Sequence, residues 1–509
     1  MKKRVLLLTL GLLLIITTAV CAGGNQASSS GSSGPVTFTI FIDHSWYPVE
    51  TFTGIIPEEI TRLTGVRLEP TIAVDDRQLG VMIGSGELPD LVYTSALTDQ
   101  LSDPDISYSF EELITRYKTG WNISPTMLGI ARGKSQDGKA YTLLNHYSDT
   151  ADWKNSNSVP MLPSLIYRTD LYKAIGSPPM RNFDELFDVF TKIKQAYPNL
   201  GAVLKLNRDW NVAIFNSLAG LGHAGEYNFP EQPNGSYLWY GQDPRYKEAI
   251  AFLNKCWRAG FISPDESYFV RGSVAVPAGE WFASSSCTQN SLPGSLAEHQ
   301  LINPNYTLAE MVPFANSTFI TSNIGWSGTF ITKKNKNPEQ AIKFMQWMFS
   351  PEAQALTQMG RKNIDYTLNS QGLPVFSATW LNALTDNTHN KVYNPWFYLG
   401  GSETVEADSR VAPTDPALVA DAYRIMRERY DNRPWVAAAR PIGNSDEKVV
   451  LDKVKELTAT YEPRLIMAAS PADFESLYRE YTTNLERTGV TQLNTYMNNK
   501  IKEILPMYR

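Results

Sequence analysis

The sequence predicts an α/β protein with more than one domain, on three observations. Strand and helix patterns alternate over the first folded part of the chain, which is typical of a mainly parallel sheet with helices on its faces. A second block with the same alternation begins near Leu165. The chain has 509 residues, and a single hydrophobic core rarely extends beyond about 250–300 residues.

The first residues are typical of an export signal. Residues 2–4 are basic, and an apolar run from Val5 to Val20 follows. A membrane-spanning helix needs about 20 apolar residues, so this run is short for one, and it ends at small residues as a secretory signal does. Cys21 stands directly after it, where bacterial lipoproteins carry the cysteine that is diacylated. We therefore expect residues 1–21 to be the signal peptide.

Cys21 leaves two outcomes open. Thr18 and Val20 depart from the usual lipoprotein signal, so cleavage after Ala22 without lipidation is the alternative to lipid attachment at Cys21. Residues 22–35 are rich in Gly and Ser, a composition that behaves as a flexible coil and suits a tether. We expect the protein to be exported to the cell surface or periplasm and held at the membrane only by its lipid.

The first folded elements are predicted from periodicity. Apolar residues alternate over 36–42 as in a strand, and a helix over 57–63 ends at Gly65, a typical C-terminal cap. A second strand starts at Val66, and a third, short strand covers 90–93. Between them lies a helix with one apolar face, formed by Leu79, Met82 and Ile83.

The second block repeats this pattern. A strand over 165–168 leads into a helix, and Asn182 caps the next helix with Glu185 three residues on, in a capping-box pattern. Further predicted elements are a helix over 246–259, an extended segment over 318–332, a helix that begins at Asn337-Pro338, and helices from Pro471 onward.

Four motifs stand in order along the chain. They are Thr64-Gly65-Val66 with Ser85-Gly86-Glu87-Leu88-Pro89-Asp90; Tyr167-Arg168-Thr169-Asp170 through Gly176, with Phe183-Asp184-Glu185-Leu186; residues 333–344; and residues 474–494. In this order they resemble the family 1 extracellular solute-binding proteins of ABC importers. The last is similar to the tail of their large LplA/YtcQ-like lipoprotein subgroup.

This resemblance implies a two-lobed periplasmic-binding-protein-like fold of type II, in which each lobe is a mainly parallel sheet flanked by helices and the ligand is enclosed between the lobes. It also implies two membrane permeases and an ATPase as partners; we expect the protein itself to be a monomer. The expected boundaries are residues 36–160 plus about 318–385 for lobe 1, 161–317 for lobe 2, and 386–509 for a C-terminal segment of hinge-crossing loops and helices.

Composition and motifs argue against other classes of function. The 46 Lys and Arg residues face 52 Asp and Glu residues, a net charge of −6 without a basic stripe, so nucleic acid is a poor partner. The five histidines are far apart, and neither a Gly-x-Ser-x-Gly elbow nor a phosphate-binding loop is present. We therefore expect no catalytic residues and no cofactor.

Two further points concern metals and cysteines. Relatives that bind acidic polysaccharide fragments often carry a calcium loop at the position of residues 196–203, but this stretch has no carboxylate, and calcium needs six to eight oxygen ligands. We expect no metal site there. Cys256 and Cys287 could pair in an oxidising compartment or simply be buried.

Aromatic residues are the best indication of a ligand. The chain has 12 Trp and 25 Tyr, and an aromatic face can contact the C–H face of a sugar while polar groups bind its hydroxyls. We expect an oligosaccharide ligand; a peptide ligand, and a surface adhesin without a transport role, are the alternatives. The candidate ligand-binding residues at loops or strand ends are Trp46, Trp210, Trp281, Trp326 and Trp396.

Two polar residues complete the candidate set. Asp90 and Arg168 are expected to contact the ligand. Asp90 could equally cap local backbone, and Arg168 could pair with Asp170.

Overall fold

The structure is a computed structural model in which Val36–Arg509 form one compact unit. The described residues are 34–149, 152–154, 156, 158–206, 212–223, 227–263, 276–288, 291–370, 372, 374–386, 388–393, 399–411 and 416–508. The predicted signal peptide, including Cys21, lies outside them. In the described ranges, no helix is both long enough and apolar enough to cross a bilayer.

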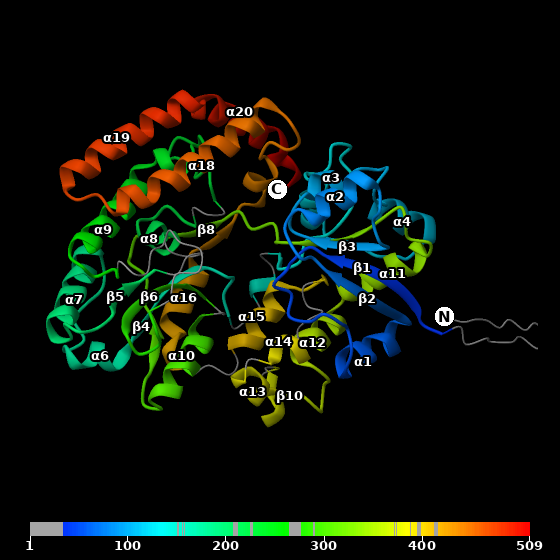
Figure 1. Ribbon diagram of the computed structural model, residues 1–509, viewed down its shortest axis with the longest axis horizontal. Helices are drawn as coiled ribbons and strands as arrows, with labels where there is room; N and C mark the ends of the chain where they lie inside the picture. The colour runs from blue at the N-terminus through cyan, green and yellow to red at the C-terminus, as the bar shows by residue number, and fades with distance from the viewer. Residues whose placement is uncertain are drawn as a thin grey trace, which may run out of the picture. The chain divides into compact units, whose positions relative to one another are not determined.

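A four-stranded sheet in the order β2-β1-β3-β9 organises the first half (Figure 1). Strand β1 (Val36–Ile42) runs parallel to β2 (Val66–Ile72) and β3 (Leu91–Thr94), whereas β9 (Gly328–Ile331) runs antiparallel to β3. Gly65, with φ +67°, ends helix α1 (Ile55–Thr64) in the left-handed conformation, which glycine adopts without steric cost. The strands and helices predicted for this region are confirmed.

Alternation along these strands gives the first half a core on each face of its sheet. Phe38, Ile40 and Ile42 point into the larger core, which α1, α4 (Phe110–Tyr117) and α11 (Pro338–Met348) cover. Phe41 points to the other face, where Leu79 of α2 (Gln78–Ser85) packs.

The second half contains a sheet in the order β5-β6-β4-β7. Its strands are β4 (Pro163–Arg168), β5 (Ala202–Lys205), β6 (Trp281–Cys287) and β7 (Leu308–Glu310). Only β5 and β6 are parallel, because β4 is antiparallel to both β6 and β7. The expectation of a mainly parallel sheet is therefore wrong for this half. Strand β4 is the first strand of this sheet along the chain, and β7 is the last before the chain returns to the first sheet at β9. These two strands run in opposite directions.

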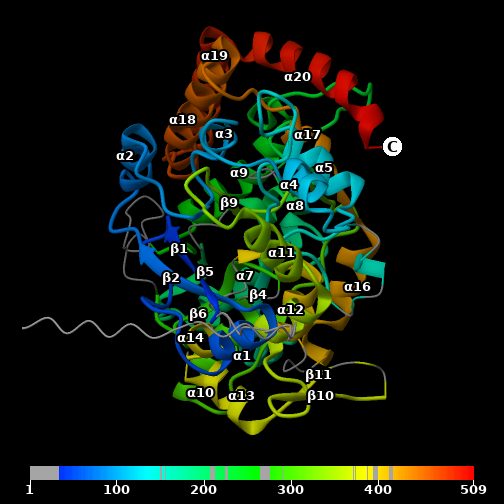
Figure 2. The same cartoon turned by 90° about the vertical axis from the view of Figure 1, so that its right-hand side faces the viewer.

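The C-terminal helices pack on the second half, as a helical extension. Helices α18 (Asp446–Ile466), α19 (Pro471–Thr488) and α20 (Val490–Ile504) share one apolar core with α7 (Phe183–Ala196) and α9 (Pro244–Arg258). Helices α18 and α19 lie side by side in both views (Figures 1 and 2).

Local details refine two predictions. The Asn182 side chain caps α7 by accepting from the Glu185 amide at 2.9 Å, but the Glu185 carboxylate accepts from the Arg181 amide and not from Asn182. Cys256 and Cys287 are both buried and form no disulfide, so burial, not pairing, accounts for them.

Crossing segments connect the two halves. The extended segment predicted over 318–332 contains two short strands, β8 (Phe319–Thr321) and β9, and β8 pairs in parallel with β12 (Tyr430–Asn432). The remaining elements are α3 (Thr98–Leu101), α5 (Pro125–Arg132), η1 (Asp152–Lys154), α6 (Thr169–Ala174), α8 (Ala213–Leu218), η2 (Tyr240–Gln242), α10 (Ser291–Ile302), α12 (Pro351–Met359), β10 (Tyr366–Leu368), β11 (Pro374–Phe376), α13 (Ala378–Thr385), α14 (His389–Val392), α15 (Glu403–Val411), η4 (Pro416–Leu418), α16 (Ala420–Glu428), α17 (Pro434–Ala438) and η5 (Leu505–Met507).

Candidate ligand-binding site

Two of the candidate tryptophans meet at one edge of the first sheet. Trp46 lies in the loop after β1, and Trp326 lies just before β9. Because β9 is antiparallel to β3, its first residue lies at the edge where the parallel strands β1 and β3 end. This carboxyl edge is where open α/β sheets usually place their ligands.

A histidine and the two indoles form a triangular group of three rings, called the stack below, in which each ring stacks on the other two. The ring centroid of His44 lies 5.0 Å from that of Trp46 and 4.9 Å from that of Trp326, with interplanar angles of 28° and 22°. The two indole centroids are 5.6 Å apart, with an interplanar angle of 29°. Trp46 is 52% exposed and Trp326 39% exposed, whereas His44 is 8% exposed. The stack therefore has one buried ring and presents two indoles to solvent.

The buried histidine of the stack is neutral at physiological pH. Burial lowers the pKa of His44 to about 4, and the Asp76 carboxylate opposes this effect only in part. Tyr93 of β3 meets the His44 ring edge-on, with centroids 5.3 Å apart. A neutral, apolar ring stack is suited to packing against an uncharged surface, such as the C–H face of a sugar.

Hydrogen bonds fix the loop that carries Trp326. The Trp326 amide donates to the Asn145 carbonyl at 3.0 Å, and the Ser327 amide donates to Asn145 Oδ1 at 3.0 Å. The Ser327 hydroxyl lies 2.6 Å from the Tyr93 hydroxyl. Gly325 has φ +89°, and a Cβ there would lie 2.5 Å from the Asn145 carbonyl oxygen, so this close approach requires glycine.

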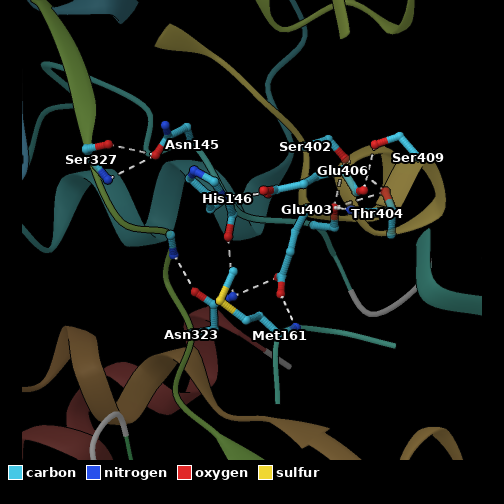
Figure 3. Close-up of polar contacts among 12 residues, drawn as sticks. Asn145, His146, Met161, Asn323, Ser327, Ser402, Glu403, Thr404, Glu406 and Ser409 are labelled. Carbon is cyan, nitrogen blue, oxygen red and sulfur yellow. Dashed lines mark hydrogen bonds and ion pairs between the residues drawn. The ribbon is translucent and has the colours of Figure 1, made fainter. Parts of the chain in front are cut away.

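Helix α15 joins this loop to the crossing segments (Figure 3). The Glu403 carboxylate accepts from the Met161 amide at 2.6 Å and from Asn323 Nδ2 at 2.9 Å. Glu406 Oε2 lies 2.7 Å from His146 Nδ1. Both glutamates are buried and belong to the first turn of α15, where negative charge is favourable. The loop before β9 is thus bonded to segments from distant parts of the chain.

A cavity of about 190 Å³ lies beside the exposed stack. Trp326 and Asn323 line it from the crossing segment, and Lys134 and Arg440 line it from two other segments. Arg440 Nη2 donates to the hydroxyl of Ser322, which also lines the cavity, at 3.2 Å. A larger hollow of about 720 Å³ lies around Glu111 and Arg132; these charges pair with each other, and aromatic residues do not line it.

Asp90 and Arg168 both have partners within the protein. Asp90 Oδ2 accepts from the amide of Thr39, on β1, at 2.9 Å and from its hydroxyl at 2.8 Å, so its backbone contact is distant in sequence and not local. Arg168 is buried, donates to the Gly279 carbonyl at 2.7 Å and pairs with Asp170. The alternative of a pair with Asp170 is confirmed for Arg168; contact of either residue with a ligand stays a prediction.

The other candidate tryptophans do not join the stack in the described structure. Trp281 is the first residue of β6, is 3% exposed, and packs edge-on against His299 with centroids 4.6 Å apart. Its indole belongs to an apolar core, not to an exposed face. Trp210 and Trp396 lie outside the described residues.

Sequence reasoning missed three parts of this site. His44 was considered only as one of five scattered histidines, although it stands two residues before Trp46 at the end of a strand, which was the available signal. Asn145 acts through its backbone carbonyl and its side-chain oxygen, and no motif indicates these contacts. Lys134 and Arg440 meet only in the folded chain.

No ion-binding arrangement accompanies the stack: in the described part of the chain, His, Cys, Asp and Glu side chains form no group of three or more that could hold a metal ion. The stack and the cavity instead offer stacking surfaces, hydroxyl and amide groups, and positive charge. Such groups are suited to binding a ligand.

Comparison with known proteins supports the fold. No protein-family model matches the sequence, and no curated protein matches it. Among solved structures, the alginate-binding protein AlgQ2 without calcium is 17% identical, with a TM-score of 0.66 over 94% of this chain and 100% of that one. The Streptococcus pneumoniae ABC-transporter substrate-binding protein FusA in complex with kestose is 15% identical, with a TM-score of 0.67 over 92% and 100%.

A third structure extends this agreement. An extracellular solute-binding protein from Bifidobacterium longum subsp. infantis is 12% identical, with a TM-score of 0.65 over 94% of this chain and 100% of that one. At such low identities the likeness concerns the fold. This chain therefore has the two-lobed α/β fold of these solute-binding proteins.

Proposed function

We propose that this protein is the extracytoplasmic substrate-binding component of an ABC importer, and that it captures an oligosaccharide at the Trp46–His44–Trp326 stack. The observation that carries the proposal is this stack itself, with two exposed indoles that stack on each other and on a buried, neutral imidazole. In this role the protein binds and delivers its ligand and does not transform it.

The environment of the stack supports a carbohydrate ligand. An indole face packs on the C–H face of a pyranose, and surrounding polar groups select its hydroxyls. The Asn323 amide and the Ser322 hydroxyl are at the right place, because both line the cavity beside Trp326. Two solved structures with this fold are complexes, one with kestose and one with Man1GlcNAc.

The remaining parts of the proposal come from the sequence. We infer export by residues 1–21, lipid attachment at Cys21, and delivery of the ligand to membrane permeases by a monomer. We also propose lobe 1 as residues 36–160 plus about 318–385 and lobe 2 as 161–317, with 386–509 as the segment that crosses and covers them. The positions of β9 in the first sheet and of α18–α20 on the second half support this division.

The first experiment is a thermal-shift screen of the compact unit that begins at Val36. Neutral and acidic oligosaccharides, short peptides and free amino acids form the panel. A ligand bound only by the native state at 100-fold its Kd stabilises the protein by about 2.7 kcal/mol. We expect stabilisation by one class of oligosaccharide. Stabilisation by peptides alone would move the function to peptide uptake, and no response across the panel would favour the adhesin.

Tryptophan variants connect such binding to the site. Trp46→Ala and Trp326→Ala should each remove most of the ligand-induced shift, measured against the melting temperature of the same variant without ligand. Trp347→Ala is the matched control, because Trp347 is a partly buried tryptophan of α11 that packs near Phe344. If all three variants respond like the wild type, the ligand binds elsewhere.

A further inference from the structure

The cavity beside Trp326 has a composition that the neutral stack does not explain. Its volume of about 190 Å³ corresponds to roughly six water molecules at about 30 Å³ each. It is too small for an oligosaccharide but large enough for one substituent with the ring atoms that carry it. Its walls include the turn after α5 (Lys134), the segment after α17 (Arg440), and the crossing segment with Trp326.

Positive charge is concentrated at this cavity. Lys134 and Arg440 both line it. Burial, then the positive charges of Arg440 and Lys455, lower the pKa of Lys134 to about 8, while Asp99 opposes them. Burial and Arg440 also lower the pKa of Lys455, which lies on α18. Three cations from separate elements are therefore within electrostatic reach of one another.

Such a cluster is unfavourable unless an anion completes it. Burying an ammonium group costs free energy unless it is paired, and like charges raise that cost. Among the described residues, Lys134 takes part in none of the ion pairs that the side chains form, and Asp99 is the one carboxylate that raises its pKa. At neutral pH the Lys134 side chain still remains mainly protonated, since its pKa is above 7. It can therefore act as a positive ligand contact.

Hydrogen-bond donors surround the two cations. The hydroxyls of Ser95, Thr98 and Ser322 also line the cavity, and Arg440 Nη2 reaches Ser322. A guanidinium, an ammonium and several hydroxyls are a donor set that suits a carboxylate or sulfate oxygen. Because Trp326 forms a wall of the same cavity and a face of the stack, one sugar residue can contact both.

We propose that the cavity beside Trp326 is a subsite for an anionic group on the ligand, so that the captured oligosaccharide carries a carboxylate or a sulfate ester held by Lys134 and Arg440. This inference rests on the proposed function, because it requires the sugar to stack on Trp326. It adds that the ligand is acidic and states which residues recognise its charge.

The test compares matched ligands by titration calorimetry on the compact unit from Val36. One arm uses a uronate oligosaccharide and its carboxyl-reduced form, and the second uses a sulfated oligosaccharide and its desulfated form. Inorganic sulfate and a short peptide with a free carboxyl end are further probes. We expect one acidic oligosaccharide to bind about tenfold or more tightly than its neutral partner, since hydrogen bonds to charged groups are the strong ones.

Charge variants then locate the effect. Lys134→Gln and Arg440→Gln should abolish the preference for the acidic member. Arg132→Gln is the matched control, because Arg132 is a half-exposed cation at the end of α5, two residues before Lys134, and pairs with Glu111. This variant should keep the preference for the acidic member. Near pH 8, binding to the wild type should also take up a proton at Lys134, which appears as a binding enthalpy that depends on the buffer, and Lys134→Gln should remove this dependence.

The outcomes separate this inference from the proposed function. Equal binding of acidic and neutral oligosaccharides, still lost in Trp326→Ala, overturns the subsite and leaves sugar capture intact. Binding of the peptide alone, sensitive to Lys134→Gln, overturns both in favour of carboxylate capture from peptides. Inorganic sulfate binding without a preference for the acidic sugar also overturns the subsite, because the charge then has no part in sugar recognition.

Discussion

Two groups of tryptophan and histidine, one in each half of the molecule, have opposite environments. In the first half, the His44 ring stacks on both Trp46 and Trp326, and both indoles are exposed. In the second half, His299 meets Trp281 edge-on, with an interplanar angle of 78°, and both residues are buried. The same residue types thus form an exposed surface in one half and part of a core in the other.

Strand direction explains the difference. Trp46 follows the carboxyl end of β1, whereas Trp281 is the first residue of β6, at the amino end of the parallel pair of β5 and β6, where it lies opposite Ala202. Loops at the carboxyl ends of parallel strands are free to carry ligand contacts. At the amino end of β6 the indole instead packs with Leu292, Leu308 and Val276. Position relative to strand direction, more than residue type, separates a candidate site from a core.

The largest expected effect is on stability in the second half. Trp281→Ala should lower the free energy of unfolding by about 3–5 kcal/mol, the usual cost of removing a buried aromatic side chain. Denaturant unfolding at constant temperature measures this. Folded Trp281→Ala protein should keep the ligand affinity of the wild type. A Trp281→Ala protein of normal stability with lost affinity would place this residue in the binding site and remove the contrast.

The second effect is a loss of ligand affinity with little loss of stability, the reverse of the first. Trp46→Ala should weaken ligand binding by about 2 kcal/mol, a magnitude typical of a tryptophan hot spot. Because Trp46 is 52% exposed, its stability should change by only about 0.5 kcal/mol, as at other surface positions. Titration with the ligand found in the screen measures the affinity, and denaturant unfolding of the same sample measures the stability. Loss of stability without loss of affinity would contradict the prediction.

Much of the fold, but only part of the site, could be predicted from the sequence. Period-two alternation and glycine caps located β1, β2, β3 and α1, because these signals are local. The direction of β4 in its sheet could not be predicted, since it depends on pairing with β6 and β7 far along the chain. For the same reason Trp46 and Trp326 could be proposed one by one, but neither the meeting of their rings around His44 nor that of Lys134 and Arg440 was visible.

The third effect is a pH dependence specific to the second half. Glu310 ends β7, and burial raises its pKa to about 8, with the Ser164 hydroxyl opposing. Between about pH 4.5 and 8 the folded state keeps this proton and the unfolded state releases it, so stability falls as pH rises, by about 1.4 kcal/mol per unit. Glu310→Gln should remove this slope, measured by chemical unfolding at a series of pH values. An unchanged slope would show that Glu310 ionises normally.

The fourth effect is also a pH dependence, but it has the opposite sign and belongs to the first half. Because the pKa of His44 is lowered to about 4, the unfolded state binds a proton below about pH 6.5 that the folded state refuses. This contribution to stability is present above pH 6.5 and is lost as pH falls toward 4. His44→Phe keeps a flat ring against both indoles but cannot ionise, so the acid-sensitive part of unfolding should weaken. Tryptophan fluorescence of the folded protein should stay constant over the same range in the wild type, because a neutral His44 leaves the stack intact. A fluorescence change near pH 6.5 that is absent in His44→Phe would show that the imidazole titrates normally and that the stack opens as it is protonated.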